Sequence, residues 1–140
     1  MTRVRDAMIQ VPPLSPTDPI FMALKAMRTN NLTFVPVVSG DGTLYGLVTE
    51  GDLIRLVWRA TRADSDTVPT WIRGAGRELL LVQPLREVVT RQLDTISPDV
   101  TLEEAAEMML RQHRKVLPVV EQGKPVGYLT RSVIIDHLIG

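Results

Sequence analysis

The segment between residues 46 and 52 combines residue types that could bind a small molecule carrying phosphate and hydroxyl groups. A strand-like apolar run ends at Val48 and a helix-like pattern follows it. A helix N-terminus offers unpaired backbone N–H groups and a positive dipole end, which suit a phosphate. Thr49 adds a hydroxyl, Gly51 allows close approach, and the carboxylate of Asp52 can accept both hydroxyls of a ribose.

The same residues also have a purely structural interpretation. Thr49 and Asp52 form a T-x-x-D pattern, which caps the start of a helix and needs no ligand. The local pattern by itself favours the cap. The choice between a cap and a binding site therefore depends on the elements that surround the segment.

An internal repeat places the segment in a larger plan. Corresponding residues lie 82 positions apart, and one residue fewer in the second turn changes the offset to 81. Each repeat is predicted to be helix, strand, strand, helix, preceded by a short extended lead-in. The matching pairs are 14–16 with 96–98, 35–38 with 117–120, and 46–49 with 127–130.

Sequence signals mark the ends of the predicted elements. Asp18 before Pro19 predicts a capped helix that begins with proline, and Thr101 with Glu104 forms a capping box. Apolar residues of each last helix are expected to share one face. The strand runs are 33–38 and 115–120, and those apolar residues are Leu53, Leu56, Val57 and Ala60 in the first repeat and Ile134, Ile135 and Leu138 in the second.

The repeats predict an α/β (α+β) fold. We expect a first repeat at residues 1–60, a connection at 61–84 and a second repeat at 85–140. A repeat of about 55 residues buries too little apolar surface to be stable alone. The two repeats are therefore expected to pack sheet to sheet about a pseudo-twofold axis as one compact module.

Composition argues against several function classes. The 16 basic residues balance the 16 acidic ones, which disfavours binding to nucleic acid or to an anionic membrane surface. No apolar run approaches the ~20 residues of a membrane span, and the chain has no cysteine, so a cytoplasmic protein is expected. Common catalytic motifs are absent, and His113 and His137 stand apart without a ligand set. We predict neither an enzyme nor a metal site.

The duplicated pattern resembles the cystathionine-β-synthase (CBS) domain family, whose members occur as tandem pairs (Bateman modules). The similarity covers nearly the whole chain, including V-P-V-V at 35–38 and G-L-V-T-E-G-D-L at 46–53. The resemblance implies a regulatory module, with no required cofactor, that binds AMP, ADP, ATP or S-adenosylmethionine in clefts between repeats. It also implies a homodimer.

Carried over to this chain, the resemblance assigns phosphate and ribose roles to Thr49, Gly51 and Asp52. It further points to segments of the other repeat that would hold adenine and contribute cations for phosphate. These residues are Thr90, Arg91, Arg114, Lys115 and Val116.

The second repeat departs from the pattern at the position that matches Asp52. Thr130 is kept, but Val133 replaces the carboxylate and cannot accept a ribose hydroxyl. We expect one ribose-competent cleft per chain and a second, weak site formed by Thr33, Phe34, Thr130 and Arg131.

A ligand-free dimerisation module of the same fold is the alternative function. Val133 supports it, as does Pro13, which replaces the threonine found at position 95 of the second repeat. Trp58 and Trp71 could anchor a dimer or pack in the core. If the module senses a ligand, its target is expected to be a separate effector protein or a further part of a longer protein.

Overall fold

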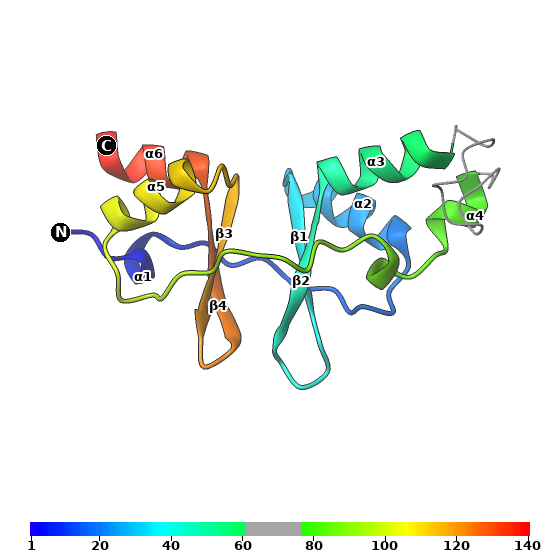
Figure 1. Ribbon diagram of the computed structural model, residues 1–140, viewed down its shortest axis with the longest axis horizontal. Coiled ribbons are helices and arrows are strands. Elements are labelled where there is room, and N and C mark those ends of the chain that lie inside the picture. The colour runs from blue at the N-terminus through cyan, green and yellow to red at the C-terminus, as the bar shows by residue number, and fades with distance from the viewer. Residues whose placement is uncertain (61–76) are drawn as a thin grey trace. The chain divides into compact units, whose positions relative to one another are not determined.

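The computed structural model describes residues 1–60 and 77–140 (Figure 1). Within them each repeat has the predicted helix, strand, strand, helix order, and the fold is of the mixed α+β class. The elements are α1 (Val4–Ala7), α2 (Ile20–Asn30), β1 (Phe34–Val38), β2 (Leu44–Thr49), α3 (Glu50–Ala60), α4 (Arg77–Leu81), the 3-10 helix η1 (Leu85–Glu87), α5 (Leu102–Arg111), β3 (Val116–Glu121), β4 (Lys124–Thr130) and α6 (Arg131–Ile139).

The chain divides into two compact units, each with its own core. Unit 1 comprises residues 1–11, 41–44 and 92–140, and unit 2 comprises residues 12–40 and 45–91. Trp71 and most of the connection between the repeats lie outside the described residues.

In unit 2 the sheet formed by β1 and β2 is extended by two single-residue bridges. Leu14 lies parallel to Val37, and Thr90 lies antiparallel to Leu47. The backbone N–H of Leu47 donates to the Thr90 carbonyl at 3.0 Å, and the N–H of Thr90 donates to the Leu47 carbonyl at 2.8 Å. Thr90 belongs to the segment that precedes the first long helix of the second repeat, the lead-in of that repeat. The lead-in of the second repeat therefore pairs with the hairpin of the first.

Unit 1 repeats this arrangement with the roles exchanged. Strands β3 and β4 are antiparallel, from Val116 opposite Thr130 to Glu121 opposite Lys124. Ile9, from the lead-in of the first repeat, forms an antiparallel bridge with Tyr128 of the second hairpin. Each hairpin is thus completed by the lead-in of the other repeat.

Two glycines permit this close pairing. A Cβ atom on Gly46 would lie 2.5 Å from the Thr90 carbonyl oxygen, and a Cβ on Gly127 would lie 2.5 Å from the Met8 sulfur. Real Cβ atoms essentially never approach so closely. Glycine at these positions in β2 and β4 lets the lead-ins lie directly on the strands.

Of the two predicted helix caps, the one at the start of α5 is confirmed and the one at the start of α2 is wrong. The Thr101 hydroxyl accepts from the Glu104 N–H at 3.2 Å, as an N-cap should. Asp18 does not cap α2: its carboxylate accepts from the Ser15 N–H at 2.7 Å. The first N–H of α2, on Ile20, donates instead to the Gln83 carbonyl at 2.8 Å, so a distant segment satisfies the helix end.

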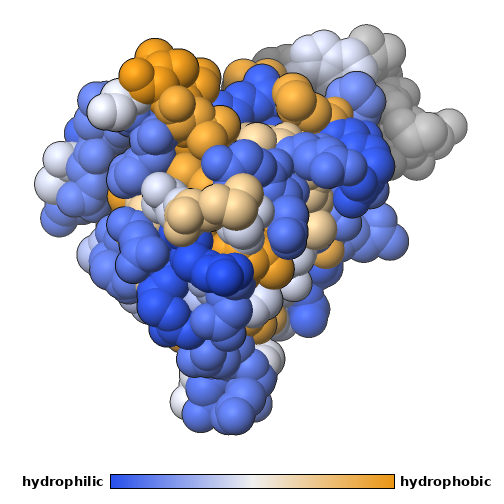
Figure 2. All heavy atoms as spheres, turned by 90° about the vertical axis from the view of Figure 1, so that its left-hand side faces the viewer, coloured by the Kyte–Doolittle hydropathy of each residue, from blue (hydrophilic) through white to orange (hydrophobic). Residues whose placement is uncertain are grey.

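The apolar residues predicted to share one face of α3 and one face of α6 differ in burial. Leu53 and Leu56 are buried, as is Ile134, whereas Val57, Ile135 and Leu138 are exposed to solvent. Hydrophobic side chains gather at the top of the face shown in Figure 2. The exposed apolar residues are Ile54, Val57 and Trp58 on α3, and Ile135, Leu138 and Ile139 on α6.

Candidate functional site

The carboxylate of Asp52 is the centre of a polar cluster inside unit 2, and its side chain is only 4% exposed. Its Oδ2 accepts from the Thr49 backbone N–H at 2.8 Å and from the Thr49 hydroxyl at 3.0 Å. Its Oδ1 accepts from Arg55 Nη2 at 2.5 Å and from the Thr90 hydroxyl at 2.7 Å. All four hydrogen bonds come from residues of unit 2.

Thr49 and Asp52 form the helix cap that their T-x-x-D pattern predicts. The Asp52 N–H donates to the Thr49 hydroxyl at 3.2 Å, while Oδ2 accepts from the Thr49 N–H at 2.8 Å. These reciprocal bonds are those of a capping box and fix the start of α3. The cap uses Oδ2, so Oδ1 is the oxygen on which side chains outside the cap converge.

A cavity of about 210 Å³ lies beside this carboxylate. Asp52 lines it together with Arg55 and Arg59, which follow on the same face of α3, and with Glu87 on the opposite segment. The cavity is small and strongly polar. Its other lining residues are Leu56, Val88 and Val89.

Unit 2 contains five of the predicted ligand residues, namely Thr49, Gly51, Asp52, Thr90 and Arg91. Thr90 contacts Asp52 directly. The Arg91 guanidinium lies over the ring of Tyr45, 3.6 Å from its centroid, as a cation–π contact.

The other three predicted residues belong to unit 1, and their grouping with Asp52 stays a prediction. Arg114 donates from Nε to Asp94 at 2.6 Å, so a phosphate would have to compete with this ion pair. Lys115 is exposed, and Val116 is buried at the start of β3.

The position in unit 1 that corresponds to the Asp52 cluster is apolar. Thr130 still caps its helix, accepting from the Val133 N–H at 3.3 Å. Val133 takes the place of Asp52, and Ile9, paired with Tyr128, takes the place of Thr90, paired with Leu47. Both members of the polar pair are therefore replaced by apolar residues.

The remaining members of the predicted weak site are divided between the two units. Arg131 donates from Nε to the Arg114 carbonyl at 3.2 Å in unit 1. In unit 2 the Thr33 carbonyl accepts from the Glu50 N–H at 3.1 Å, and Phe34 is buried.

Sequence reasoning missed Arg55 as part of the site. It lies three residues after Asp52 on a helix, a spacing that places two side chains on one face. This i, i+3 spacing is the sequence signal from which the pairing of Arg55 with Asp52 could have been predicted. The partnership with Thr90, 38 residues away, depends on the exchanged lead-in and has no local signal.

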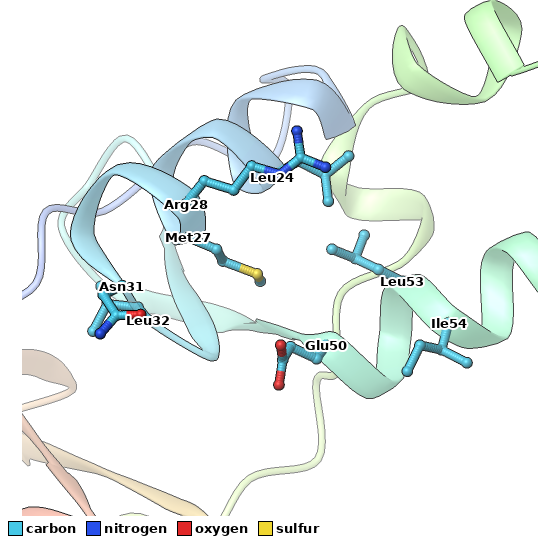
Figure 3. Close-up of a pocket in the computed structure, with 8 residues that line it drawn as sticks. All are labelled: Leu24, Met27, Arg28, Asn31, Leu32, Glu50, Leu53 and Ile54. Atoms are coloured by element: carbon cyan, nitrogen blue, oxygen red, sulfur yellow. The ribbon is translucent and has the colours of Figure 1, made fainter.

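Unit 2 also has a wider groove, of about 390 Å³, between α2 and α3 (Figure 3). Met27 and Leu53 point into the space between the two helices, and Arg28 and Glu50 stand at its margin. Its floor is apolar, and Ile54 is shared with the exposed face of α3.

Within the described residues 1–60 and 77–140, no group of three or more His, Cys, Asp or Glu side chains could hold a metal ion. His137 Nδ1 is 3.0 Å from the Val133 carbonyl oxygen, one turn earlier on the same helix. No helix in this part of the chain is long and apolar enough to cross a membrane.

Comparison with known proteins identifies the family. The CBS domain pattern matches twice, at residues 4–59 and 85–140. The chain is 31% identical over 128 residues to the CBS domain-containing protein YhcV of Bacillus subtilis, covering 91% of this chain and 79% of YhcV. The chain belongs to the CBS domain family and is a tandem CBS pair.

Other relatives share this module in different settings. The A-adding tRNA nucleotidyltransferase of Aquifex aeolicus is 28% identical over 136 residues, which is 96% of this chain but 14% of the enzyme. Among solved structures, CBSX2 in complex with AMP aligns with a TM-score of 0.78 at 24% identity, covering 99% of this chain and 97% of CBSX2. The fold of the chain is thus that of known CBS pairs.

Proposed function

We propose that this protein is a regulatory module that binds one adenine nucleotide or S-adenosylmethionine per chain, with Asp52 holding the ribose. The observation that carries the proposal is the Asp52 carboxylate, buried against a polar cavity with Oδ1 bonded only by side chains. A ribose diol can take over such bonds without breaking the helix cap on Oδ2. The AMP bound to CBSX2 supports the ligand class.

The same reasoning favours a single strong site. At the corresponding position of the second repeat, Val133 and Ile9 offer no acceptor or donor to a ribose hydroxyl. A buried hydroxyl without a partner costs about 1–3 kcal/mol. The site that includes Thr33, Phe34, Thr130 and Arg131 is therefore the weaker one.

The proposed role is regulatory and not catalytic. A ligand that binds one arrangement of the two repeats better than another shifts the population toward that arrangement, and an effector protein that distinguishes them reads the signal. We place the protein in the cytoplasm and assign it no nucleic-acid or membrane partner.

A homodimer is part of the proposal. The exposed residues Ile54, Val57 and Trp58 of α3 correspond, at the offset of 81, to Ile135, Leu138 and Ile139 of α6, which are also exposed. Both repeats thus leave the same helix positions apolar, as an interface would require. Dimerisation without a ligand is the alternative function.

The experiment is thermal unfolding with and without AMP, ADP, ATP and S-adenosylmethionine. A ligand at a hundred times its Kd should add about 2.7 kcal/mol of stability. Asp52→Asn should abolish that gain, while retaining a carbonyl oxygen for the cap. Asp18→Asn is the matched control, because Asp18 also accepts a backbone N–H in unit 2 but does not line the cavity.

If no ligand stabilises the wild-type protein, the sensor proposal fails and the dimerisation module takes its place. If Asp52→Asn keeps the full gain, the protein binds a ligand but not through Asp52. A gain retained by Asp18→Asn and lost by Asp52→Asn supports the proposal.

A further inference from the structure

We infer that Arg55 selects ligands that carry a phosphate, so that the site takes adenosine nucleotides in preference to adenosine and S-adenosylmethionine. The inference rests on the proposed function and narrows its ligand class. It starts from the ion pair between Arg55 and the buried Asp52, in which Arg55 Nη2 lies 2.5 Å from Oδ1.

Every acceptor position of the Asp52 carboxylate is occupied before a ligand arrives. A carboxylate has about four lone-pair sites. Thr49 fills those of Oδ2, and Arg55 and Thr90 fill those of Oδ1. A ribose can therefore bond to Asp52 only by displacing a donor.

Arg55 is the donor that is easiest to displace. The side chain of Arg55 is 59% exposed, so its guanidinium regains water when it leaves the carboxylate. Thr49 belongs to the helix cap, and Thr90 is held by two backbone hydrogen bonds to Leu47. Binding of a ribose diol thus separates Arg55 from its counter-ion.

The displaced guanidinium is already close to the start of α3. A Cβ atom built on Gly51 would lie 3.5 Å from Arg55 Nη1 and 3.7 Å from the Thr49 hydroxyl oxygen. The guanidinium and this hydroxyl thus converge over the first turn of the helix. A phosphate there can accept from both and gives Arg55 a new counter-ion, in the bidentate geometry that guanidinium groups favour.

The three ligand types differ in what they offer Arg55. Adenosine displaces the guanidinium and leaves it without a counter-ion. AMP supplies a phosphate, whereas S-adenosylmethionine brings a sulfonium and an ammonium, and its single carboxylate leaves it with a net positive charge. The other carboxylate that lines the cavity belongs to Glu87, whose Oε1 lies 4.0 Å from Arg86 Nε, so it already has a guanidinium partner.

The test is isothermal titration of the full chain with adenosine, AMP and S-adenosylmethionine, for the wild type and for Arg55→Gln. We expect the wild type to bind AMP at least 10-fold more tightly than the other two ligands. In Arg55→Gln the ratio of the adenosine Kd to the AMP Kd should fall at least 10-fold. AMP binding weakens, while adenosine binding is unchanged or tighter because its competitor is gone.

Two further variants keep the result interpretable. Arg28→Gln removes the same charge from α2, outside the cavity that Asp52 lines, so it should change the ratio less than threefold. Arg55→Lys keeps the charge and should retain most of the preference for AMP. Thermal unfolding of each variant establishes that it is folded.

Equal weakening of adenosine and AMP in Arg55→Gln would overturn the inference, because Arg55 would then only support Asp52. An unchanged ratio, or tighter binding of S-adenosylmethionine than of AMP by the wild type, would overturn it as well. If the wild type binds none of the three ligands, the proposed function itself has failed, and the wild-type titration alone shows this.

Discussion

Asp52 combines two roles in one carboxylate, since Oδ2 completes the cap of α3 and Oδ1 receives Arg55 and Thr90. The T-x-x-D pattern left a cap and a binding site as alternatives. The structure shows that the cap occupies only one of the two oxygens. A structural role and the proposed ligand role are therefore compatible at this residue.

Asp52→Ala should destabilise the protein by about 2–4 kcal/mol even without a ligand. The variant removes four hydrogen bonds from a buried position and leaves Thr90 and the helix start without their acceptor. Denaturant unfolding measures this. A loss below about 0.5 kcal/mol would show that the carboxylate is not held as described.

The buried phenol of Tyr128 should make the free energy of unfolding depend on pH in the alkaline range. Burial raises the pKa of Tyr128 to about 12, from the ordinary value of 10.0. In the unfolded chain the phenol loses its proton near pH 10, while the folded protein keeps it until about pH 12. The unfolded state then binds fewer protons than the folded state, so stability falls as the pH rises through this window.

The measurement is denaturant unfolding of the wild type and Tyr128→Phe at several values from pH 8 to pH 12. Tyr128→Phe should lose less stability than the wild type above pH 10. Parallel curves for the two proteins would contradict the assignment of this effect to Tyr128.

At the scale of the elements, the local sequence patterns did not predict which strands the two lead-ins pair with. The order of the main helices and strands follows from apolar periodicity and turn residues, and the bounds of β1 and β3 agree with the predicted runs 33–38 and 115–120 to within one residue. Pairing of Thr90 with Leu47 and of Ile9 with Tyr128 joins residues far apart in the chain, and no local pattern encodes it. The error at Asp18 has the same origin, because the Gln83 carbonyl satisfies the start of α2.

Each lead-in lies against a glycine in the hairpin of the other repeat, and we predict unequal effects of substituting these two glycines. Gly46→Ala places a Cβ against the Thr90 backbone oxygen, which cannot move without disturbing the bridge, and should cost about 2–3 kcal/mol. Gly127→Ala meets the side chain of Met8, which can adjust in part, and should cost about 1 kcal/mol less.

Gly40→Ala is the control, since nothing lies within 4 Å of a Cβ at that position. Its stability should stay within about 0.5 kcal/mol of the wild type. Equal stability of all three variants in denaturant unfolding would show that the lead-ins do not lie on the strands as described.

At the scale of the whole molecule, the exposed apolar residues of α3 and α6 are the proposed dimer interface. Periodicity predicted the apolar residues of α3 and α6, but it could not separate those facing the core from those facing outward, because both kinds recur at helical spacing. Burial places Leu53 and Leu56 inside and leaves Ile54, Val57 and Trp58 exposed.

Ile54→Lys combined with Trp58→Glu should convert the proposed dimer into a folded monomer, because charged side chains on an apolar interface must be desolvated. Sedimentation at several concentrations measures the change. Leu79→Lys, at an exposed apolar residue of α4, is the control. A wild-type protein that is monomeric at high micromolar concentration would contradict the homodimer.

The most direct test of the central claim is calorimetric titration of the wild type and Asp52→Asn with AMP, read for stoichiometry. Asp52 and Thr90 form the polar pair in unit 2, whereas Val133 and Ile9 are their counterparts in unit 1. The wild type should therefore bind close to one AMP per chain at the tight site, and Asp52→Asn should lose that site. Two equally tight sites per chain, or a tight site that survives in Asp52→Asn, would contradict the account.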